Sequence, residues 1–150
     1  MKVLLICESV HHGNTKKVAD AMASVMNAEV KKPGDVDPGK LGEYNLIGFG
    51  SGIFYGKMHK GLIKLAGSLP ALDKKAFVFS TAGNQDEKMK YHGELKGLLA
   101  AKGFKVMDEF TCQGFDTFGP LKLIGGINKG KPDETNLEDA RKFAQKLLAA

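Results

Sequence analysis

The stretch VLLICESVHHGNTKKVADAM, residues 3–22, contains the unit from which the fold can be worked out. Its first part, Val3–Cys7, is a continuous apolar run of the kind found in strands buried on both faces of a parallel sheet. A helical pattern follows the polar residues, with apolar side chains at Val18, Ala21, Met22, Val25 and Met26. The turn between them holds two histidines, a glycine, an asparagine and a threonine. It is open to three interpretations: an ordinary helix cap, a metal site or an anion site.

Further apolar runs predict four more strands: a weak one over 28–32, buried ones over 46–50 and 76–80, and an edge strand over 105–112. Helical spacing predicts helices over about 58–69, 91–99 and 137–148, the last with Thr135 and Glu138 as a capping box. This alternation predicts a single α/β domain over residues 1–150. We expect a doubly wound five-stranded parallel sheet of order 2-1-3-4-5 between two helix layers, a three-layer αβα sandwich. Ligands of such sheets bind beyond the carboxyl ends of the strands, where the strand order reverses.

The composition, with 43% hydrophobic and 26% charged residues, is that of a globular protein. Despite a net charge of +5, the lysines are dispersed and Arg141 is the only arginine, so we do not expect nucleic-acid binding. Cys7 and Cys112 lie in apolar runs with no metal-ligand spacing, which favours two buried thiols. The first apolar run is too short for a signal peptide or a membrane span, and we therefore expect a cytoplasmic protein.

The loop Ser9–Thr15 leads from a buried strand into a helix, where backbone N–H groups and the helix dipole favour an anion. Gly13 permits close approach, and Ser9, Asn14 and Thr15 add donors that suit a phosphomonoester. Neither G-x-x-x-x-G-K-[ST] nor G-x-G-x-x-G is present. A plain helix cap by Asn14 and Thr15 is the competing interpretation. The adjacent histidines lack further ligands at suitable spacing, so we expect no metal site.

Three more loops leave the same predicted edge of the sheet. Gly50–Gly56 places Phe54 and Tyr55 after a buried strand, where they either pack on the next helix or stack on a planar ligand. Ser80–Asn84 offers hydroxyl and N–H groups, or forms a simple turn. The segment 112–119 presents two further aromatic residues between glycines. Together with the first loop they suggest a phosphate cradle, a polar shelf and two aromatic walls.

The motif S-x-x-H-G-N-T after the first strand and G-S-G-I-F-Y-G-K-M-H-K after the third resemble the flavodoxin family, and the resemblance covers the whole chain. It implies non-covalent FMN, with the phosphate in the first loop, the ribityl chain and pyrimidine edge along 80–84, and aromatic residues on both faces of the ring. No catalytic residue is assigned. The candidate cofactor-binding residues are Ser9, His11, His12, Gly13, Asn14, Thr15, Ser51, Gly52, Ile53, Phe54, Tyr55, Gly56, Ser80, Thr81, Ala82, Gly83, Asn84, Gly114, Phe115 and Phe118.

The sequence departs from the family pattern in the phosphate loop. Val10 stands where the family usually has its first hydroxyl residue, and His12 replaces the middle threonine. The chain also has no tryptophan, and it is basic where electron-carrier flavodoxins are typically acidic. If His11 and His12 add charge beside the phosphate, FMN affinity should weaken as the pH rises through the histidine range.

The resemblance implies an electron carrier between redox proteins, and Lys57, Lys60 and Lys64 favour acidic partners such as a ferredoxin-like protein or a reductase. The alternative is a flavin-dependent oxidoreductase of the quinone reductase or protoporphyrinogen oxidase type. In that case His59 would approach a substrate; a solvent-facing helix histidine is the competing interpretation. A phospho-receiver domain of the same topology is excluded, because it needs paired acidic residues after the first strand and an aspartate after the third. The oligomeric state is not indicated.

Overall fold

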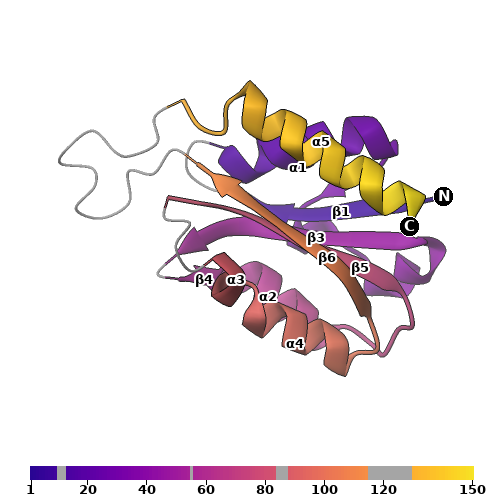
Figure 1. The fold of residues 1–150 in the computed structure, drawn as a ribbon. Helices are drawn as coiled ribbons and strands as arrows, with labels where there is room; N and C mark the ends of the chain where they lie inside the picture. Colours follow the sequence, from indigo (N-terminus) through magenta and orange to yellow (C-terminus); the bar gives the residue numbers. More distant parts are fainter. Residues whose placement is uncertain (10–12, 55, 84–87, 115–129) are drawn as a thin grey trace.

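The computed structural model describes residues 1–9, 13–54, 56–83, 88–114 and 130–150, which form a sheet with helices on both faces (Figure 1). The strands are β1 (Val3–Glu8), β2 (Glu29–Lys31), β3 (Leu46–Phe54), β4 (Lys57–Met58), β5 (Lys75–Ala82) and β6 (Lys105–Gln113). The helices are α1 (Asn14–Met26), α2 (Lys60–Ser68), α3 (Lys88–Tyr91), α4 (Gly93–Ala101) and α5 (Glu134–Ala149). Two short 3-10 helices, η1 (Pro33–Asp35) and η2 (Pro38–Glu43), connect β2 to β3.

The sheet has the order β2-β1-β3-β5-β6, and all neighbours on this path are parallel. Counting these five strands alone gives the predicted order 2-1-3-4-5, so the predicted flavodoxin-like α/β fold is confirmed. The additional strand β4 pairs antiparallel with the end of β3. Because the five main strands are parallel, their carboxyl ends meet at one edge of the sheet, on the left of Figure 1.

The two helix layers bury opposite faces of the same strands. Along β1, Leu5 and Cys7 face a core shared with α1 and α5, whereas Leu4 and Ile6 face a core shared with α2 and α4. This alternation follows from the two-residue period of a strand. Burial on both faces explains why β1 reads as a continuous apolar run. No described helix is long and apolar enough to cross a membrane.

Two glycines in β3 make room for aromatic rings of the neighbouring strand. A Cβ at Gly48 would overlap the Phe77 ring, and a Cβ at Gly50 would overlap the Phe79 ring. Both rings are completely buried. The rings therefore lie directly over the backbone of β3. They form part of the core between the sheet and helices α1 and α5.

The last helix is capped by residues other than those predicted. The Asp133 carboxylate accepts from the Asn136 N–H at 3.0 Å, and the Asn136 side chain accepts from the Asp133 N–H at 2.9 Å. Thr135 lies inside the first turn, and Glu138 instead accepts from Arg141 at 3.0 Å. The capping-box prediction for Thr135 and Glu138 was wrong because Asp133, one residue before the helix, has a side chain that reaches the same N–H groups.

Two element boundaries differ from the predictions, and one strand pair has an irregular register. Strand β3 continues to Phe54 and forms a hairpin with β4, so the helix predicted from residue 58 begins at Lys60. The helix predicted over 91–99 is two helices that meet at His92. The register between β5 and β6 shifts between Ala76 and Phe77. At an irregularity of this kind one strand carries an extra residue, so the strict alternation of its side chains between the two faces of the sheet is interrupted.

We predict that Gly50→Ala lowers the free energy of unfolding by about 1–3 kcal/mol, because a methyl group must displace a buried ring. Gly67→Ala is the matched control: Gly67 lies exposed within α2 with open space around its Cα. Alanine there should raise stability by about 0.5–1 kcal/mol. Urea unfolding of both variants measures the difference; equal effects at the two positions would contradict the packing argument.

Candidate functional site

The site begins at the amino end of α1. Gly13 precedes the helix at φ +66°, a left-handed conformation that glycine adopts without strain. The first turn carries no acidic residue, and the Ser9 hydroxyl accepts from the Lys16 N–H at 3.1 Å. Asn14 and Thr15 are the first residues of the helix, so the interpretation of these two as plain helix caps was wrong. The positive end of the helix dipole thus faces the sheet edge without a carboxylate to neutralise it.

The Thr15 side chain, at the start of α1, lies against the last residues of two strands, β3 and β5. The Thr15 hydroxyl lies 2.8 Å from the Thr81 hydroxyl, and both groups are buried. A Cβ on Gly52 would lie 3.8 Å from the same Thr15 oxygen. The helix that follows β1 and the carboxyl-terminal parts of β3 and β5 therefore meet at Thr15.

The residue that follows β6 also packs against the start of α1. A Cβ on Gly114 would lie 2.6 Å from the Asn14 side-chain nitrogen, so only glycine fits this position without a shift. The Gly114 N–H also donates to the Ala82 carbonyl at 3.1 Å. In this way the four segments predicted to converge at the carboxyl edge of the sheet do converge. We call the group of Gly13, Thr15, Gly52, Thr81 and Gly114 the cradle.

The β3–β4 hairpin fixes the second candidate loop. The buried Ser51 hydroxyl accepts from the His59 N–H at 2.9 Å and donates to the Gly52 carbonyl at 2.8 Å. Gly56 takes a φ of +75° at the turn. The His59 ring lies edge-on to the Phe54 ring with centroids 5.9 Å apart. Phe54 therefore packs against the cap of the following helix, as one of the two sequence interpretations proposed.

His59 itself caps α2. Its Nδ1 accepts from the Gly61 N–H at 2.9 Å, which leaves Nε2 as the protonated nitrogen of the neutral ring. The interpretation of His59 as a solvent-facing helix residue was wrong, because the chain enters the helix one residue later. The side chain is half-buried at the helix start.

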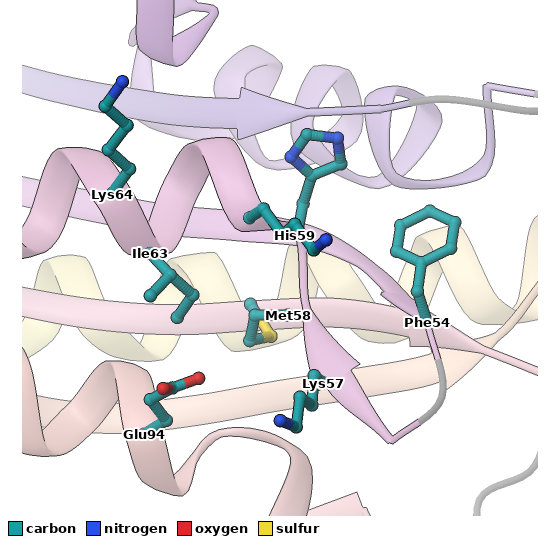
Figure 2. A pocket seen from close by; sticks show the side chains of 8 residues that line it. Phe54, Lys57, Met58, His59, Ile63, Lys64 and Glu94 are labelled. Carbon is teal, nitrogen blue, oxygen red and sulfur yellow. The ribbon is translucent and has the colours of Figure 1, made fainter.

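A cavity of about 780 Å³ adjoins this hairpin (Figure 2). Its apolar part comes from Phe54, Met58 and Ile63, and Figure 2 shows Met58 and Ile63 side by side in the wall. Its charged lining consists of Lys57, Lys60, Lys64 and Glu94. In the described part of the chain these three lysines form no ion pair. A second cavity of about 660 Å³ lies on the other side of the cradle, against Ser9, Gly13 and Lys16.

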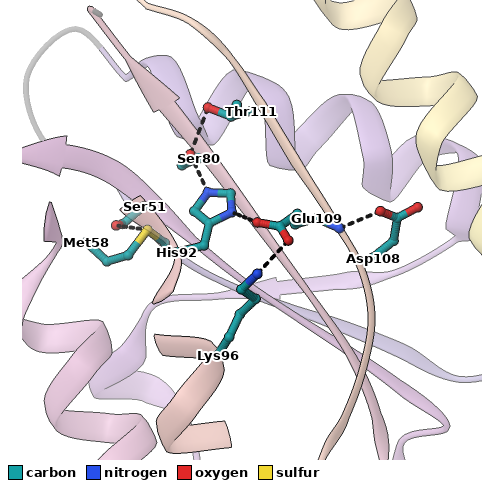
Figure 3. A network of polar contacts seen from close by, with 8 residues as sticks. All are labelled: Ser51, Met58, Ser80, His92, Lys96, Asp108, Glu109 and Thr111. Atoms are coloured by element: carbon teal, nitrogen blue, oxygen red, sulfur yellow. Dashed lines mark hydrogen bonds and ion pairs between the residues drawn. The ribbon is translucent and has the colours of Figure 1, made fainter. Parts of the chain in front are cut away.

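A polar network that the sequence did not indicate joins β5, β6 and α4 (Figure 3). His92 Nε2 lies 2.7 Å from the Ser80 hydroxyl, and Nδ1 lies 2.9 Å from the Glu109 carboxylate. Ser80 donates to the Thr111 hydroxyl at 2.9 Å, and Lys96 donates to the other Glu109 oxygen at 2.7 Å. The available signal was the spacing of His92 from the core residues Leu95 and Leu99, three and seven positions later, which places the ring on the buried helix face.

Burial and charge shift the pKa values in this network in opposite ways. Burial lowers the pKa of His92 from its ordinary value of 6.5, although the hydrogen bond to Glu109 acts in the other direction. Partial burial raises the pKa of Glu109, but its hydrogen bonds to Lys96 and His92 outweigh this and hold it below the ordinary value. Glu109 is therefore a carboxylate at neutral pH.

Several predicted site residues lie outside the described residues: His11, His12, Tyr55, Asn84, Phe115 and Phe118. The described residues contain no group of three or more His, Cys, Asp and Glu side chains placed to hold a metal ion. Cys7 and Cys112 are buried and form no disulfide, and burial raises the pKa of each thiol to about 12.

Comparison with known proteins identifies the family. A family model described as a flavodoxin domain matches residues 5–115. An uncharacterized protein of Methanocaldococcus jannaschii is 43% identical over 148 residues, which cover 99% of both chains. The structures of a flavodoxin from the domain Archaea and of flavodoxin 2 from Bacillus cereus have the same fold, with TM-scores of 0.71 and 0.74. Their sequence identities are 20% and 16%, and the matches cover 99% of this chain and 97% and 99% of theirs.

The chain belongs to the flavodoxin family, whose cofactor is FMN. The described residues fit this group. The start of α1 offers an anion the helix dipole without a competing carboxylate, and glycines at Gly13, Gly52 and Gly114 keep the cradle open to close backbone approach.

The Thr15–Thr81 contact should be energetically coupled. Thr15→Val or Thr81→Val alone leaves a buried hydroxyl without this partner, and each should lower the free energy of unfolding by about 1–2 kcal/mol. Because the double variant leaves no hydroxyl behind, its loss should be about 1 kcal/mol smaller than the sum of the two single losses. Urea unfolding of the cofactor-free protein measures this cycle; simple additivity would refute the coupling.

Proposed function

We propose that this protein carries electrons between redox proteins, using FMN held at the cradle. The observation that carries the proposal is the convergence of four strand ends on the first turn of α1. In this arrangement the phosphate lies at the start of α1, near Gly13 and Thr15. Gly52–Phe54, Thr81–Gly83 and Gly114 border the rest of the cofactor.

When bound, FMN supplies the redox chemistry, accepting and releasing one or two electrons. The chain binds and orients it. The Thr15–Thr81 pair ties the phosphate end to β5, and the Ser51 hydroxyl, held by the His59 N–H, fixes the carbonyl of Gly52. Neither role requires a side chain that acts as an acid or a base.

The partner surface is proposed to be the cationic side of the cavity in Figure 2. Lys57, Lys60 and Lys64 lie on β4 and α2, next to the hairpin that borders the cradle. Three lysines that form no ion pair with any described residue lie around apolar Phe54 and Met58. They favour an acidic protein whose carboxylates meet the lysines while apolar atoms enter the cavity. A ferredoxin-like protein or an acidic reductase has this character.

The same cavity favours one second candidate. Its apolar wall and its volume also suit a small organic substrate, as in a flavin-dependent oxidoreductase of the quinone reductase or protoporphyrinogen oxidase type. Stopped-flow oxidation of the reduced protein separates the two. Slow reaction with quinones and fast reaction with a one-electron protein acceptor supports the carrier, and the reverse order supports the enzyme.

Asn14→Asp tests the placement of the phosphate. Aspartate has nearly the same shape as asparagine, so this substitution adds a negative charge at the first position of α1 with little change in packing. The same charge repels a phosphate, and the Kd for FMN should rise about tenfold or more.

Riboflavin, which lacks the phosphate, serves as the control ligand, and its affinity should change little. Fluorescence titration measures both. A colourless protein that ignores added FMN would overturn the proposed function, and equal weakening of the two ligands would overturn the placement of the phosphate.

The lysine surface makes a separate prediction. The triple variant Lys57→Gln, Lys60→Gln, Lys64→Gln should slow electron transfer with an acidic ferredoxin about tenfold at low ionic strength, because steering by opposite charge is lost. The matched control replaces three exposed lysines distant from the cavity, Lys40, Lys105 and Lys142. Stopped-flow rates across a salt series measure the effect. If both triple variants slow electron transfer equally, the rate depends on the net charge of the protein and the proposed partner surface is wrong.

A further inference from the structure

His92 is a buried histidine at the junction of α3 and α4, with 1% of its surface exposed, and both ring nitrogens have partners. Ser80 and Thr111 lie opposite each other in the β5–β6 register and continue the hydrogen-bond chain from the ring to β6. Lys96 holds the far oxygen of Glu109. The five side chains form the network of Figure 3.

The hydrogens of this network can be arranged in two complete ways. With Ser80 donating to Thr111, the Ser80 oxygen must accept from Nε2–H of His92. The Glu109 carboxylate accepts only, so Nδ1 must also carry a hydrogen. The ring is then an imidazolium, and every polar atom between the ring and Thr111 has a partner.

The neutral ring also has a hydrogen-bond partner for each of its two nitrogens. The Nδ1 hydrogen stays toward Glu109, Nε2 becomes an acceptor, and Ser80 turns its hydrogen from Thr111 to the ring. Thr111 can then donate to Ser80, which reverses the direction of that bond. A proton can therefore be added to His92 without moving a heavy atom, since only two hydroxyl hydrogens rotate.

The network adjoins the cradle along both strands. Ser80 directly precedes Thr81, whose hydroxyl meets Thr15 at the start of α1. Thr111 lies three residues before Gly114, which packs against the side chain of Asn14. The hydrogen-bond partners of His92 thus lie on the two strands, β5 and β6, that lead to Thr81 and Gly114 of the cradle.

The order serine, histidine, glutamate also resembles a nucleophilic triad, but a hydrolytic role does not fit. Ser80 has no exposed surface and lies inside β5, so its hydroxyl cannot meet a substrate. The network holds a proton and does not present a nucleophile.

We propose that His92 takes up a proton when negative charge is added at the cradle and releases it when that charge leaves. The inference rests on the proposed function, because FMN brings that charge. In a reduction step one electron would pass from the reduced partner protein to the FMN held at the cradle, and one proton would pass from solvent to Nε2 of His92, so the net charge of the region would be unchanged. On oxidation the electron would pass to an oxidised partner protein and the proton would return to solvent.

The surroundings of the ring act on its protonation in opposite directions, with burial the largest influence. Glu109 of β6 favours the imidazolium, whereas burial and Lys96 of α4 favour the neutral ring. β5 contributes only the neutral Ser80 hydroxyl to the ring. Asp108, next to Glu109 on β6, receives the Glu109 N–H and pairs with Lys146 of α5 at 3.3 Å. The helices also carry Glu94 of α4 and Lys90 of α3, while Lys75 and Lys105 lie at the far ends of β5 and β6.

Histidine-resolved NMR titration tests the proposal, with His92→Gln used to assign the ring signal. The pKa of His92 is measured in the cofactor-free protein, in the FMN-loaded oxidised protein and in the loaded protein reduced with dithionite under nitrogen. We expect the pKa to rise on reduction by about one unit, the size expected for a unit charge acting through a partly screened interior. The amount of bound FMN is measured separately, from the visible absorption spectrum of the protein.

Thr111→Val separates this role from a structural one. Valine cannot accept the Ser80 hydrogen, so the imidazolium loses its complete network and the pKa of His92 should fall in every state while FMN stays bound. Thr135→Val, at an exposed position of α5, is the matched control and should leave the pKa unchanged.

Two results would overturn the inference. One is a loaded protein whose His92 pKa is the same before and after reduction; the other is a Thr111→Val variant that titrates like wild type. A protein that does not take up FMN would instead overturn the proposed function.

Discussion

The reversal of strand order between β1 and β3 is the constraint on which the rest of this structure depends. From β1 the chain passes through α1 to β2 on one side, and from β3 it passes through α2 to β5 on the other. Right-handed crossovers then place α1 and α2 on opposite faces of the sheet. These two connections therefore leave the ends of β1 and β3 in opposite directions, and the first turn of α1 lies beside the point where they diverge.

Aromatic packing fixes β3 and β5 against each other and against α5. Phe77 and Phe79 of β5 lie over the glycines of β3, and Phe77 also meets Phe143 of α5 with ring centroids 5.7 Å apart. The strands whose ends form the cradle thus share one aromatic layer with the helix above them. Interiors packed this closely move little, so the polar groups at the edge start from well-defined positions.

The sequence was sufficient for the fold because burial on both faces leaves a plain signal. Continuous apolar runs marked β1, β3 and β5, and their alternation with helical patterns left few strand orders. It failed where short-range geometry decides the outcome. A two-residue strand such as β4 has no periodicity, and the register shift beside Phe77 depends on the partner strand.

The convergence of the four candidate loops was predictable from the sequence, but the polar network around His92 was not. Parallel strands require the four loops to share an edge, and the contacts of Thr15 with Thr81 and of Gly114 with Asn14 follow that expectation. The His92 network was not predictable, because Ser80 and Thr111 are 31 residues apart and become partners only through the β5–β6 register. A histidine in helical spacing with Leu95 was the single local indication of it.

The central claim is that one point, the start of α1 with the strand ends around it, holds the cofactor phosphate. Backbone amide NMR of the cofactor-free protein, titrated separately with FMN and with riboflavin, tests this most directly. The account predicts that the shifts that differ between the two ligands are concentrated at Gly13, Asn14 and Thr15, and that shifts common to both appear at Gly52, Thr81 and Gly114. Phosphate-dependent shifts centred on Lys74 and Lys105, at the opposite edge of the sheet, would contradict it.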